Sequence, residues 1–153
     1  MAYFDSISQV PEPAVAEHGR SVEGPSNRIA FLDARAHYIN GVGYYENDSV
    51  VEACAEYLKT LEVMESHIEE KEMVGHKARF MAYTYNRLGD MFEEQLLAEP
   101  AIASYKQALA FCKREPTSKY GIPVVLYSIG IQFDVSGQLD SACFYYDEAL
   151  TNK

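Results

Sequence analysis

One pattern occurs three times in this chain and aligns without a gap, over residues 37–61, 85–109 and 126–150. Each copy contains a glycine that is followed three residues later by an aromatic residue, twelve residues later by an alanine and sixteen residues later by a tyrosine. The three glycines are Gly41, Gly89 and Gly130. Self-similarity of this kind indicates a repeat architecture, in which every copy is one supersecondary unit that packs on its neighbours.

The spacing within a copy predicts a helical hairpin. Intervals of three and four residues place side chains on one face of a helix. A glycine on one helix and an alanine on the other let the two axes approach closely, and aromatic side chains fill the groove beside them. Gly41 is therefore expected to serve packing. A nucleotide-binding role is not expected for "INGVGYYEN", because Glu46 stands where a GxGxxG loop needs its third glycine.

Turn-forming residues divide each hairpin, and turns are predicted at 46–49, 96–100 and 135–140. Helix N-caps are predicted at Asp48 or Ser49 and at Asp140, because short polar side chains satisfy the first free backbone N–H groups. Helices are predicted over about 27–46, 50–73 and 77–96. The joint at 112–123 contains two prolines and a glycine and is predicted to be partly a loop.

The second and third copies resemble the tetratricopeptide repeat, which combines an aromatic residue, Leu-Gly, Tyr, Ala and Phe at fixed offsets. In the second copy these positions hold Tyr85, Leu88, Gly89, Phe92, Ala101 and Tyr105. In the third they hold Leu126, Ile129, Gly130, Phe133, Ala142 and Tyr146. The first copy is degenerate, with His37 and Asn40 where the family prefers large apolar residues. The resemblance implies an all-α fold, an α-solenoid of about three antiparallel helical hairpins with extended helices.

Equivalent residues lie 48 and then 41 positions apart, whereas the usual period is about 34. The glycine-to-alanine distance stays at twelve, so the additional residues fall between hairpins and are expected to lengthen helices. We predict a single domain that begins with an irregular segment and continues as three hairpins, over residues 1–28, 29–75, 76–116 and 117–153. Long-spaced, tyrosine-rich repeats are similar to those of Bacteroidetes tetratricopeptide proteins, which implies the sensory or partner-binding part of a longer regulator.

The charge of the chain excludes some partners. Its 13 basic and 23 acidic side chains give a formal charge of -10, which repels nucleic acid and anionic membranes. No apolar stretch is long enough to span a bilayer and no export signal is recognisable, so a cytoplasmic location is expected unless the N-terminus is truncated. The three cysteines have no paired spacing and are interpreted as small buried apolar residues.

Sequence motifs for catalysis are absent, and neither an enzyme nor a cofactor is expected. His67 and His76 lie nine residues apart with Gly75 between them, so they do not form a helical pair of metal ligands like that of HExxH. Glu93, Glu94 and Glu99 have no histidine at ExxH spacing, as a di-iron bundle would need. A metal-binding helical protein or an enzyme remains a remote alternative.

The resemblance implies a binding face for a peptide or protein partner along the first helices of the hairpins. The implied residues are Tyr38, Val42, Tyr45, Asn86, Asp90, Glu93, Tyr127, Ile131 and Asp134. Their aromatic and acidic character favours a partner with apolar anchors and basic flanks. It argues against a chaperone tail, whose carboxylate would need lysine and asparagine on this face. The alternative is that these side chains pack internally and that the chain is a scaffold for self-association, such as a homodimer.

Overall fold

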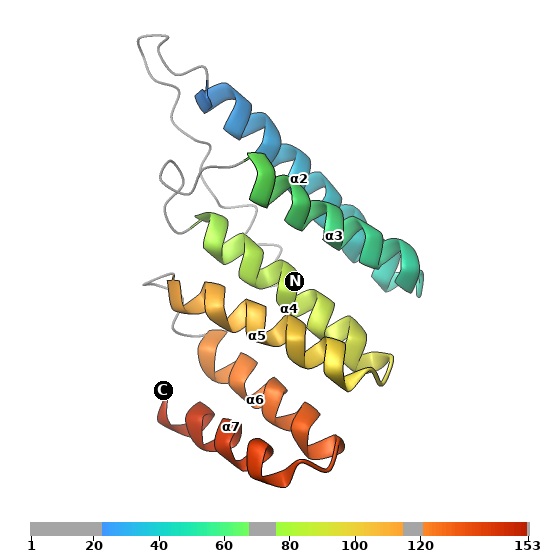
Figure 1. The fold of residues 1–153 in the computed structure, drawn as a ribbon. Helices are drawn as coiled ribbons and strands as arrows, with labels where there is room; N and C mark the ends of the chain where they lie inside the picture. Colours follow the sequence, from blue (N-terminus) through green and yellow to red (C-terminus); the bar gives the residue numbers. More distant parts are fainter. Residues whose placement is uncertain (1–22, 68–75, 115–120, 153) are drawn as a thin grey trace. The chain divides into compact units, whose positions relative to one another are not determined.

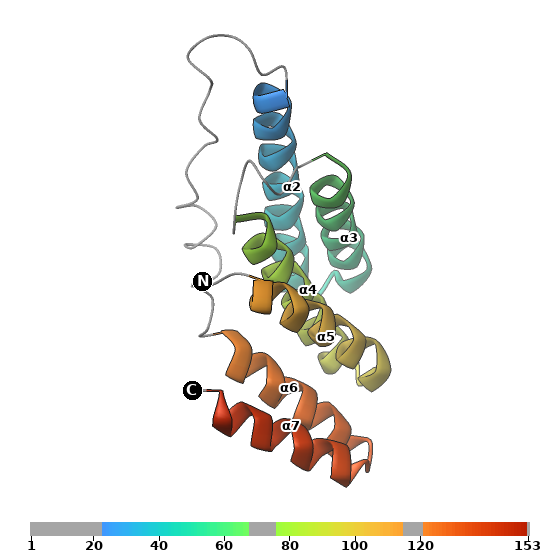
Figure 2. The ribbon, with the colours of Figure 1, turned by 60° about the vertical axis from the view of Figure 1, so that its left-hand side comes forward.

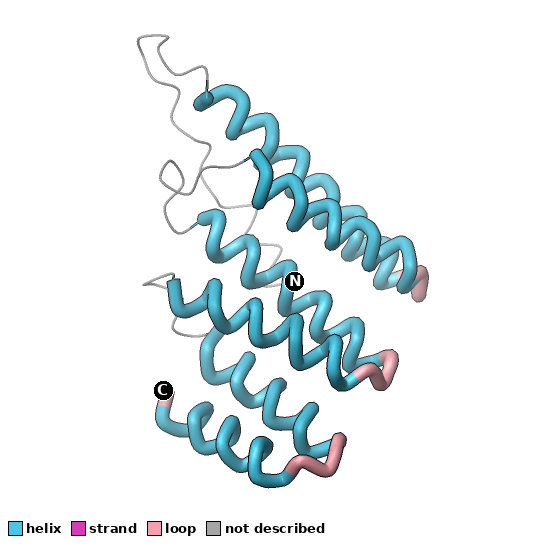
Figure 3. The backbone as a smooth tube through the Cα atoms, viewed as in Figure 1, coloured by secondary structure: helices cyan, strands magenta, loops and turns pink. Residues whose placement is uncertain are grey.

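A computed structural model describes residues 23–67, 76–114 and 121–152, and within these ranges the chain is helical and contains no strand. The helices of this part are α2 (Glu23–Glu46), α3 (Val50–His67), α4 (His76–Glu94), α5 (Ala98–Arg114), α6 (Gly121–Val135) and α7 (Leu139–Thr151) (Figure 1). Short loops join them in pairs, α2 to α3, α4 to α5 and α6 to α7 (Figure 3). The prediction of an all-α fold built from helical hairpins with extended helices is confirmed.

The chain forms two compact units, Met1–Phe80 and Met81–Lys153, and the boundary between them falls inside α4. In the first unit α2 packs along α3, and the two helices lie side by side in both ribbon views (Figure 2). In the second unit α5 packs on α6, and α6 packs on α7. The compact units therefore do not coincide with the hairpins, because α4 contributes residues to both units.

The observed helix bounds refine the predicted ones. Helix α2 begins at Glu23 rather than at about residue 27, and α4 ends at Glu94 rather than at Leu96. Prolines explain two further differences. Pro100 and Pro123 were expected in loops, yet each lies in the first turn of a helix, α5 and α6 respectively. The first backbone N–H groups of a helix have no partner within it, so a proline there removes no hydrogen bond.

Two other predicted segments lie partly outside the described residues. The helix predicted over 50–73 is described only as far as His67, and the joint predicted over 112–123 is described on either side of residues 115–120. Cysteine burial differs from the prediction. Only Cys112 is buried, whereas Cys54 is half-buried and Cys143 is exposed. Burial raises the pKa of the Cys54 thiol.

The three turns share one backbone arrangement. The residue seven positions after each repeat glycine has a positive φ, with values of 59° at Asp48, 60° at Leu96 and 77° at Gly137. Its N–H donates to the carbonyl three residues earlier, and the next N–H donates to the carbonyl five residues earlier, as Ser49 does to Tyr44 at 2.9 Å. This pair of bonds is the Schellman motif, which satisfies carbonyls that a helix end leaves unpaired.

The turn confirms one predicted N-cap and corrects another. Helix α3 begins at Val50 directly after Ser49, whose carbonyl accepts a hydrogen bond from the Ala53 N–H. Ser49 is therefore the cap, as one of the two predicted alternatives, and Asp48 is the left-handed residue of the turn. Helix α7 begins at Leu139 after Gln138, which makes no side-chain capping bond, and Asp140 lies in the first turn. In this turn the residue that follows the left-handed residue becomes the N-cap of the next helix. Its backbone position decides this, and its side chain does not.

Each repeat glycine lies against the tyrosine sixteen residues further on. A Cβ atom placed on Gly41 would lie 2.6 Å from the ring of Tyr57, and one on Gly130 would lie 2.6 Å from the ring of Tyr146. Tyr105 lies against Gly89 in the same way. The prediction that Gly41 serves packing is confirmed. Its close neighbour is the tyrosine ring, however, and not the alanine that the sequence analysis placed opposite it.

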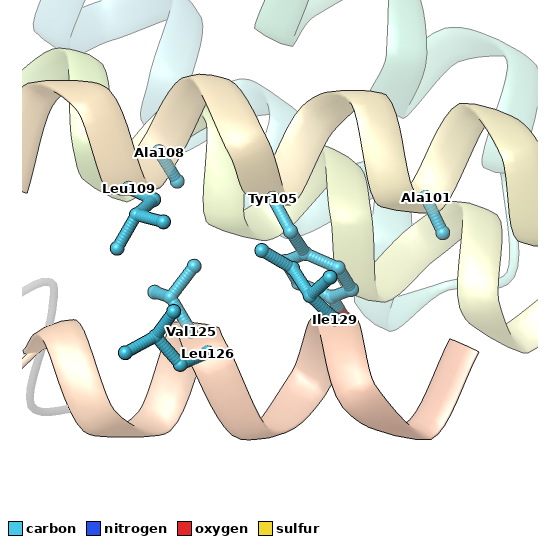
Figure 4. Packing of buried hydrophobic residues seen from close by; sticks show 7 residues of the cluster. All are labelled: Ala101, Tyr105, Ala108, Leu109, Val125, Leu126 and Ile129. Carbon is cyan, nitrogen blue, oxygen red and sulfur yellow. The ribbon is translucent and has the colours of Figure 1, made fainter. Parts of the chain in front are cut away.

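Buried side chains link the helices within each unit. In the first, the ring centroid of Tyr38 lies 5.8 Å from that of Tyr57 and 5.5 Å from that of Phe80. In the second, apolar residues of α5 and α6 face one another in a cluster, Ala101, Tyr105, Ala108, Leu109, Val125, Leu126 and Ile129 (Figure 4). Along the described residues, no helix combines the length and apolar character needed to cross a membrane.

Candidate functional site

A groove of about 580 Å³ opens in the second unit between the C-terminal ends of α4 and α6. One part of its lining is acidic, with Glu93 and Glu94 at the end of α4. Another part is apolar, with Leu96 in the turn after α4 and with Ile131 and Val135 on α6. This volume lies within the range of about 300–1,000 Å³ that is typical of ligand pockets.

Local structure places these side chains. Ile131 and Val135 are four residues apart, so they lie on one face of α6. Leu96 occupies the left-handed position of the Schellman turn, which leaves its side chain 91% exposed. A leucine is unfavourable there twice over, since a non-glycine residue is strained at positive φ and its apolar surface stays in water.

Two carboxylates beside the groove are held by a buried phenol. The Tyr105 hydroxyl lies 2.7 Å from Asp90 Oδ1 and 2.7 Å from Glu93 Oε2. The tyrosine belongs to α5 and its side chain is fully buried, so it fixes these carboxylates from within the hairpin. Both Asp90 and Glu93 project from α4, one turn apart.

Protonation links these three groups. Burial raises the pKa of Asp90, against the opposing effects of the Tyr105 hydrogen bond and of Arg87. Burial, together with the two carboxylates, also raises the pKa of Tyr105. A phenol has one proton to donate. When Asp90 carries a proton, its O–H can donate to the Tyr105 oxygen while Tyr105 donates to Glu93.

The third copy repeats part of this arrangement. The Tyr146 hydroxyl donates to Asp134 Oδ2 at 3.2 Å. In both copies the carboxylate lies four residues after the repeat glycine and the tyrosine lies sixteen after it. Sequence reasoning missed this pairing, although the shared offset was a signal that could have found it. In the first copy the carboxylate position holds Tyr45 instead.

Two of the nine predicted binding residues lie in the interior. Tyr38 is fully buried and Asn86 is nearly so. Both stand three residues before a repeat glycine. Tyr38 contacts Phe80, which belongs to the first helix of the next hairpin, so this position faces a neighbouring helix rather than an open surface. Tyr127, its equivalent in the last described hairpin, is 56% exposed.

The structure brings some of the remaining residues together and separates others. Glu93 and Ile131 line the groove, and Asp90 binds the same tyrosine as Glu93. Tyr127 and Asp134 lie on α6 but do not line it, and each contacts Tyr146. The last two, Val42 and Tyr45, are half-buried on α2 in the first unit.

Metal ligation finds no support among the residues that the structure describes, where no group of three or more His, Cys, Asp or Glu side chains could hold an ion. The side chains of His67 and His76 fall outside those described. His37 lies between two carboxylates, with Nδ1 2.6 Å from Glu56 Oε2 and Nε2 3.6 Å from Asp33 Oδ1. Because Glu56 belongs to α3, this contact ties α2 and α3 together.

Comparison with known proteins assigns no family. Neither a scan against protein-family models nor a search of curated proteins gives a match for this chain. Among the described residues, the groove and its hydrogen-bonded carboxylates are the features that bear on function.

Proposed function

We propose that this chain is a non-enzymatic, tetratricopeptide-like interaction module and that a peptide or helix of a partner protein binds in the groove between α4 and α6. The observation that carries the proposal is the groove itself, in which an acidic part and an apolar part converge. In a longer protein similar to the Bacteroidetes regulators, this chain would be the part that recognises the partner.

The lining favours a particular chemistry in the partner. An apolar side chain can cover Leu96, Ile131 and Val135, removing exposed apolar surface from water. A lysine or arginine beside it can pair with Glu93 and Glu94. The net charge of -10 adds long-range attraction for such a cation. A partner that ends in a free carboxylate at this position would instead be repelled.

The unfavourable position of Leu96 supports the same proposal. At this positive-φ surface position a glycine would form the same turn with less backbone strain than a leucine does. Costly local conformations of this kind occur most often where a protein binds or acts. In the proposed complex the leucine becomes part of the contact surface, which accounts for its presence.

A charge reversal tests the proposal, using peptides selected from a random display library on the immobilised chain. We expect enrichment of peptides that combine an apolar residue with neighbouring Lys or Arg. Glu94→Lys should weaken the binding of these peptides by about tenfold or more, equivalent to about 1.4 kcal/mol. Asp90 and Glu93 are unsuitable for this test, because a lysine there would also break a hydrogen bond to Tyr105.

Glu99→Lys is the matched control. Glu99 is an exposed carboxylate in the first turn of α5 and does not line the groove, yet its reversal changes the net charge equally. The affinity of the Glu99→Lys variant for the selected peptides should stay within about twofold of that of the unmodified chain. Only the change in net charge acts on the peptide, and this long-range effect is screened by salt. Equal losses in the two variants, or selection of acidic peptides, would contradict the proposal.

A further inference from the structure

Helix α2 carries an apolar stripe on its outer side. Its members are Ile29, Leu32, Ala36, Ile39 and Gly43, which we call the α2 seam. The three large residues are 68%, 45% and 38% exposed in this order, and Ala36 is exposed as well. A Cβ atom placed on Gly43 would meet nothing within 4 Å, so the fifth position is also open.

The opposite side of the same helix is apolar too. Phe31, Ala34 and Tyr38 are buried within the first unit. A helix that is apolar on one side only can leave its other side in water, whereas one that is apolar all round is normally covered all round. We would therefore expect the α2 seam to be covered as well. The described residues of the first unit leave it exposed.

The equivalent surface is a packing surface elsewhere in the repeat. Ala36 and Gly43 stand five residues before and two residues after a repeat glycine, and in α6 these positions hold Val125 and Gln132. Both α6 residues are buried, and Val125 belongs to the cluster formed with α5. The repeat thus uses this side of its first helix to contact another helix.

The spacing and the flanking charges indicate which helix fits. The seam residues are separated by 3, 4, 3 and 4 positions, which are the a and d positions of a two-heptad coiled coil. Asp33 then occupies an e position, while Arg28 and Arg35 occupy g positions. In a parallel pair of identical helices each g residue faces the e residue five positions further along the other helix, so that Arg28 meets Asp33 and Arg35 meets Asn40. An antiparallel pair would place like charges together.

We propose that the occupant of the α2 seam is the α2 seam of a second copy of this chain, packed in parallel. Ile29, Leu32 and Ile39 supply the apolar contact, and the small residues Ala36 and Gly43 allow the two axes to approach closely. The helix is already folded as part of a hairpin, so pairing does not have to nucleate it. This pairing involves the first unit and is independent of the groove proposed for the partner in the second.

Sedimentation equilibrium of the full chain tests the pairing. We expect the mass to approach twice the monomer value of 17.2 kDa as the concentration rises from about 1 µM to about 1 mM. The seam variant Leu32→Asp with Ile39→Asp should remain monomeric throughout. Its control is Val51→Asp with Leu58→Asp, which introduces the same charges seven residues apart on exposed positions of α3 and should still dimerise.

Disulfide cross-linking tests whether the two α2 helices pair in parallel, and it does so without introducing charged residues into the seam. With Cys143 replaced by serine to remove the exposed thiol, Leu32→Cys should form an intermolecular disulfide on mild oxidation, because parallel pairing places the two copies of position 32 side by side. Val51→Cys in the same background should not. A dimer that fails to cross-link through position 32 would overturn the parallel arrangement.

The remaining outcomes overturn the proposal. A chain that stays monomeric up to about 1 mM has no such interface. A seam variant that dimerises as well as the unmodified chain shows that another surface is used. If the unmodified chain is monomeric and the seam variant loses thermal stability while the α3 control does not, the seam is covered by another part of the same chain, such as residues 1–22.

Discussion

At the scale of single residues, two glycines separated by one position do different things. Gly41 lies against the buried ring of Tyr57, whereas Gly43 lies in open space. Both substitutions to alanine bring the same gain in helix propensity, about 0.5–1 kcal/mol. Only the first also pushes a methyl group into a packed aromatic ring.

We therefore predict that Gly41→Ala lowers the free energy of unfolding by about 1–3 kcal/mol, the usual cost of overpacking, and that Gly43→Ala raises it by up to about 1 kcal/mol. Urea unfolding followed by circular dichroism measures both, at a protein concentration low enough for the monomer. Changes of the same sign in the two variants would show that the contact with Tyr57 is not what requires glycine at position 41.

The carboxyl group of Asp90 provides a second prediction, because its pKa is raised in the folded chain. In the unfolded chain an aspartate titrates near its ordinary value of 3.8. The folded state thus binds the proton up to a higher pH, and the stability associated with it is complete below 3.8 and is lost as the pH rises through the raised pKa. Asn cannot ionise, and its side-chain N–H can donate to the Tyr105 oxygen as the protonated Asp90 carboxyl does.

Accordingly, Asp90→Asn should change stability more favourably at pH 7 than at pH 4. The measurement is the free energy of unfolding of both proteins at the two pH values, from urea titrations. The difference between variant and unmodified chain should become more positive as the pH rises. A difference that stays constant, or that moves the other way, would mean that the Asp90 pKa is not raised by folding.

Residue positions also show what the sequence could and could not predict. The glycine, alanine and tyrosine offsets were sufficient to predict the hairpins, because close helix packing leaves a direct trace in residue size. The same offsets could not show that Tyr38 and Asn86 are interior residues. Their burial depends on what lies beyond the hairpin, and a repeat pattern read from one hairpin does not contain that information.

At the scale of elements, the turns are the most regular feature, and their left-handed position holds three different residues, Asp48, Leu96 and Gly137. Leucine in this conformation costs about 1–2 kcal/mol relative to a residue without a Cβ atom. Leu96→Gly is expected to raise the free energy of unfolding by about 1 kcal/mol, since little burial is lost from a side chain so exposed. Gly137→Ala should lower it by a similar amount.

Both turn variants can be compared by thermal unfolding under identical conditions. Leu96→Gly carries a second expectation, because Leu96 also lines the groove. It should weaken peptide binding while it stabilises the fold, whereas Gly137→Ala should leave the binding unchanged. A Leu96→Gly chain that is less stable than the unmodified one would contradict the role assigned to the left-handed position.

Helix boundaries could be predicted only where the local preferences of capping residues and prolines match the backbone geometry of the turns. Polar residues before a helix suggested caps at Asp48 or Ser49 and at Asp140. The Schellman bonds select the cap by backbone position, which agrees with Ser49 and not with Asp140. Prolines suggested loops at 100 and 123, but proline is tolerated in a first helical turn. At Asp140 a backbone constraint overrode the local signal, whereas at the two prolines the local signal was compatible with a helix start.

At the scale of the whole molecule, the formal charge of -10 affects folding and binding in opposite ways. Like charges repel one another in the compact state, and salt weakens that repulsion, since the screening length falls from about 10 Å at 0.1 M to about 3 Å at 1 M. Raising NaCl over this range should therefore increase the melting temperature of the chain.

The same addition of NaCl should lower the affinity for a basic peptide, because the attraction between unlike charges is screened in the same way. Differential scanning fluorimetry and fluorescence anisotropy measure the two effects on one protein preparation. A melting temperature and an affinity that change in the same direction would show that one of the two is not governed by the acidic charge.

Some of the residues that line the groove were predicted from the sequence and others were not. Glu93 and Ile131 were predicted because the resemblance places them on first helices, and both line it. Glu94 and Leu96 were missed. They stand at a helix end and in a turn, where the direction of a side chain depends on the Schellman geometry and not on helical periodicity.

The bond between Tyr105 and Glu93 has a consequence for the thermodynamics of recognition. Ordering a flexible side chain on binding costs about 0.5–1.5 kcal/mol. Glu93 is already held by a buried hydroxyl at 2.7 Å, so most of that ordering is complete once the chain has folded. Glu94 is exposed and keeps its rotamer freedom. A cation that reaches the groove therefore meets one carboxylate at a set position, which can select its geometry, and a second that can adjust to it.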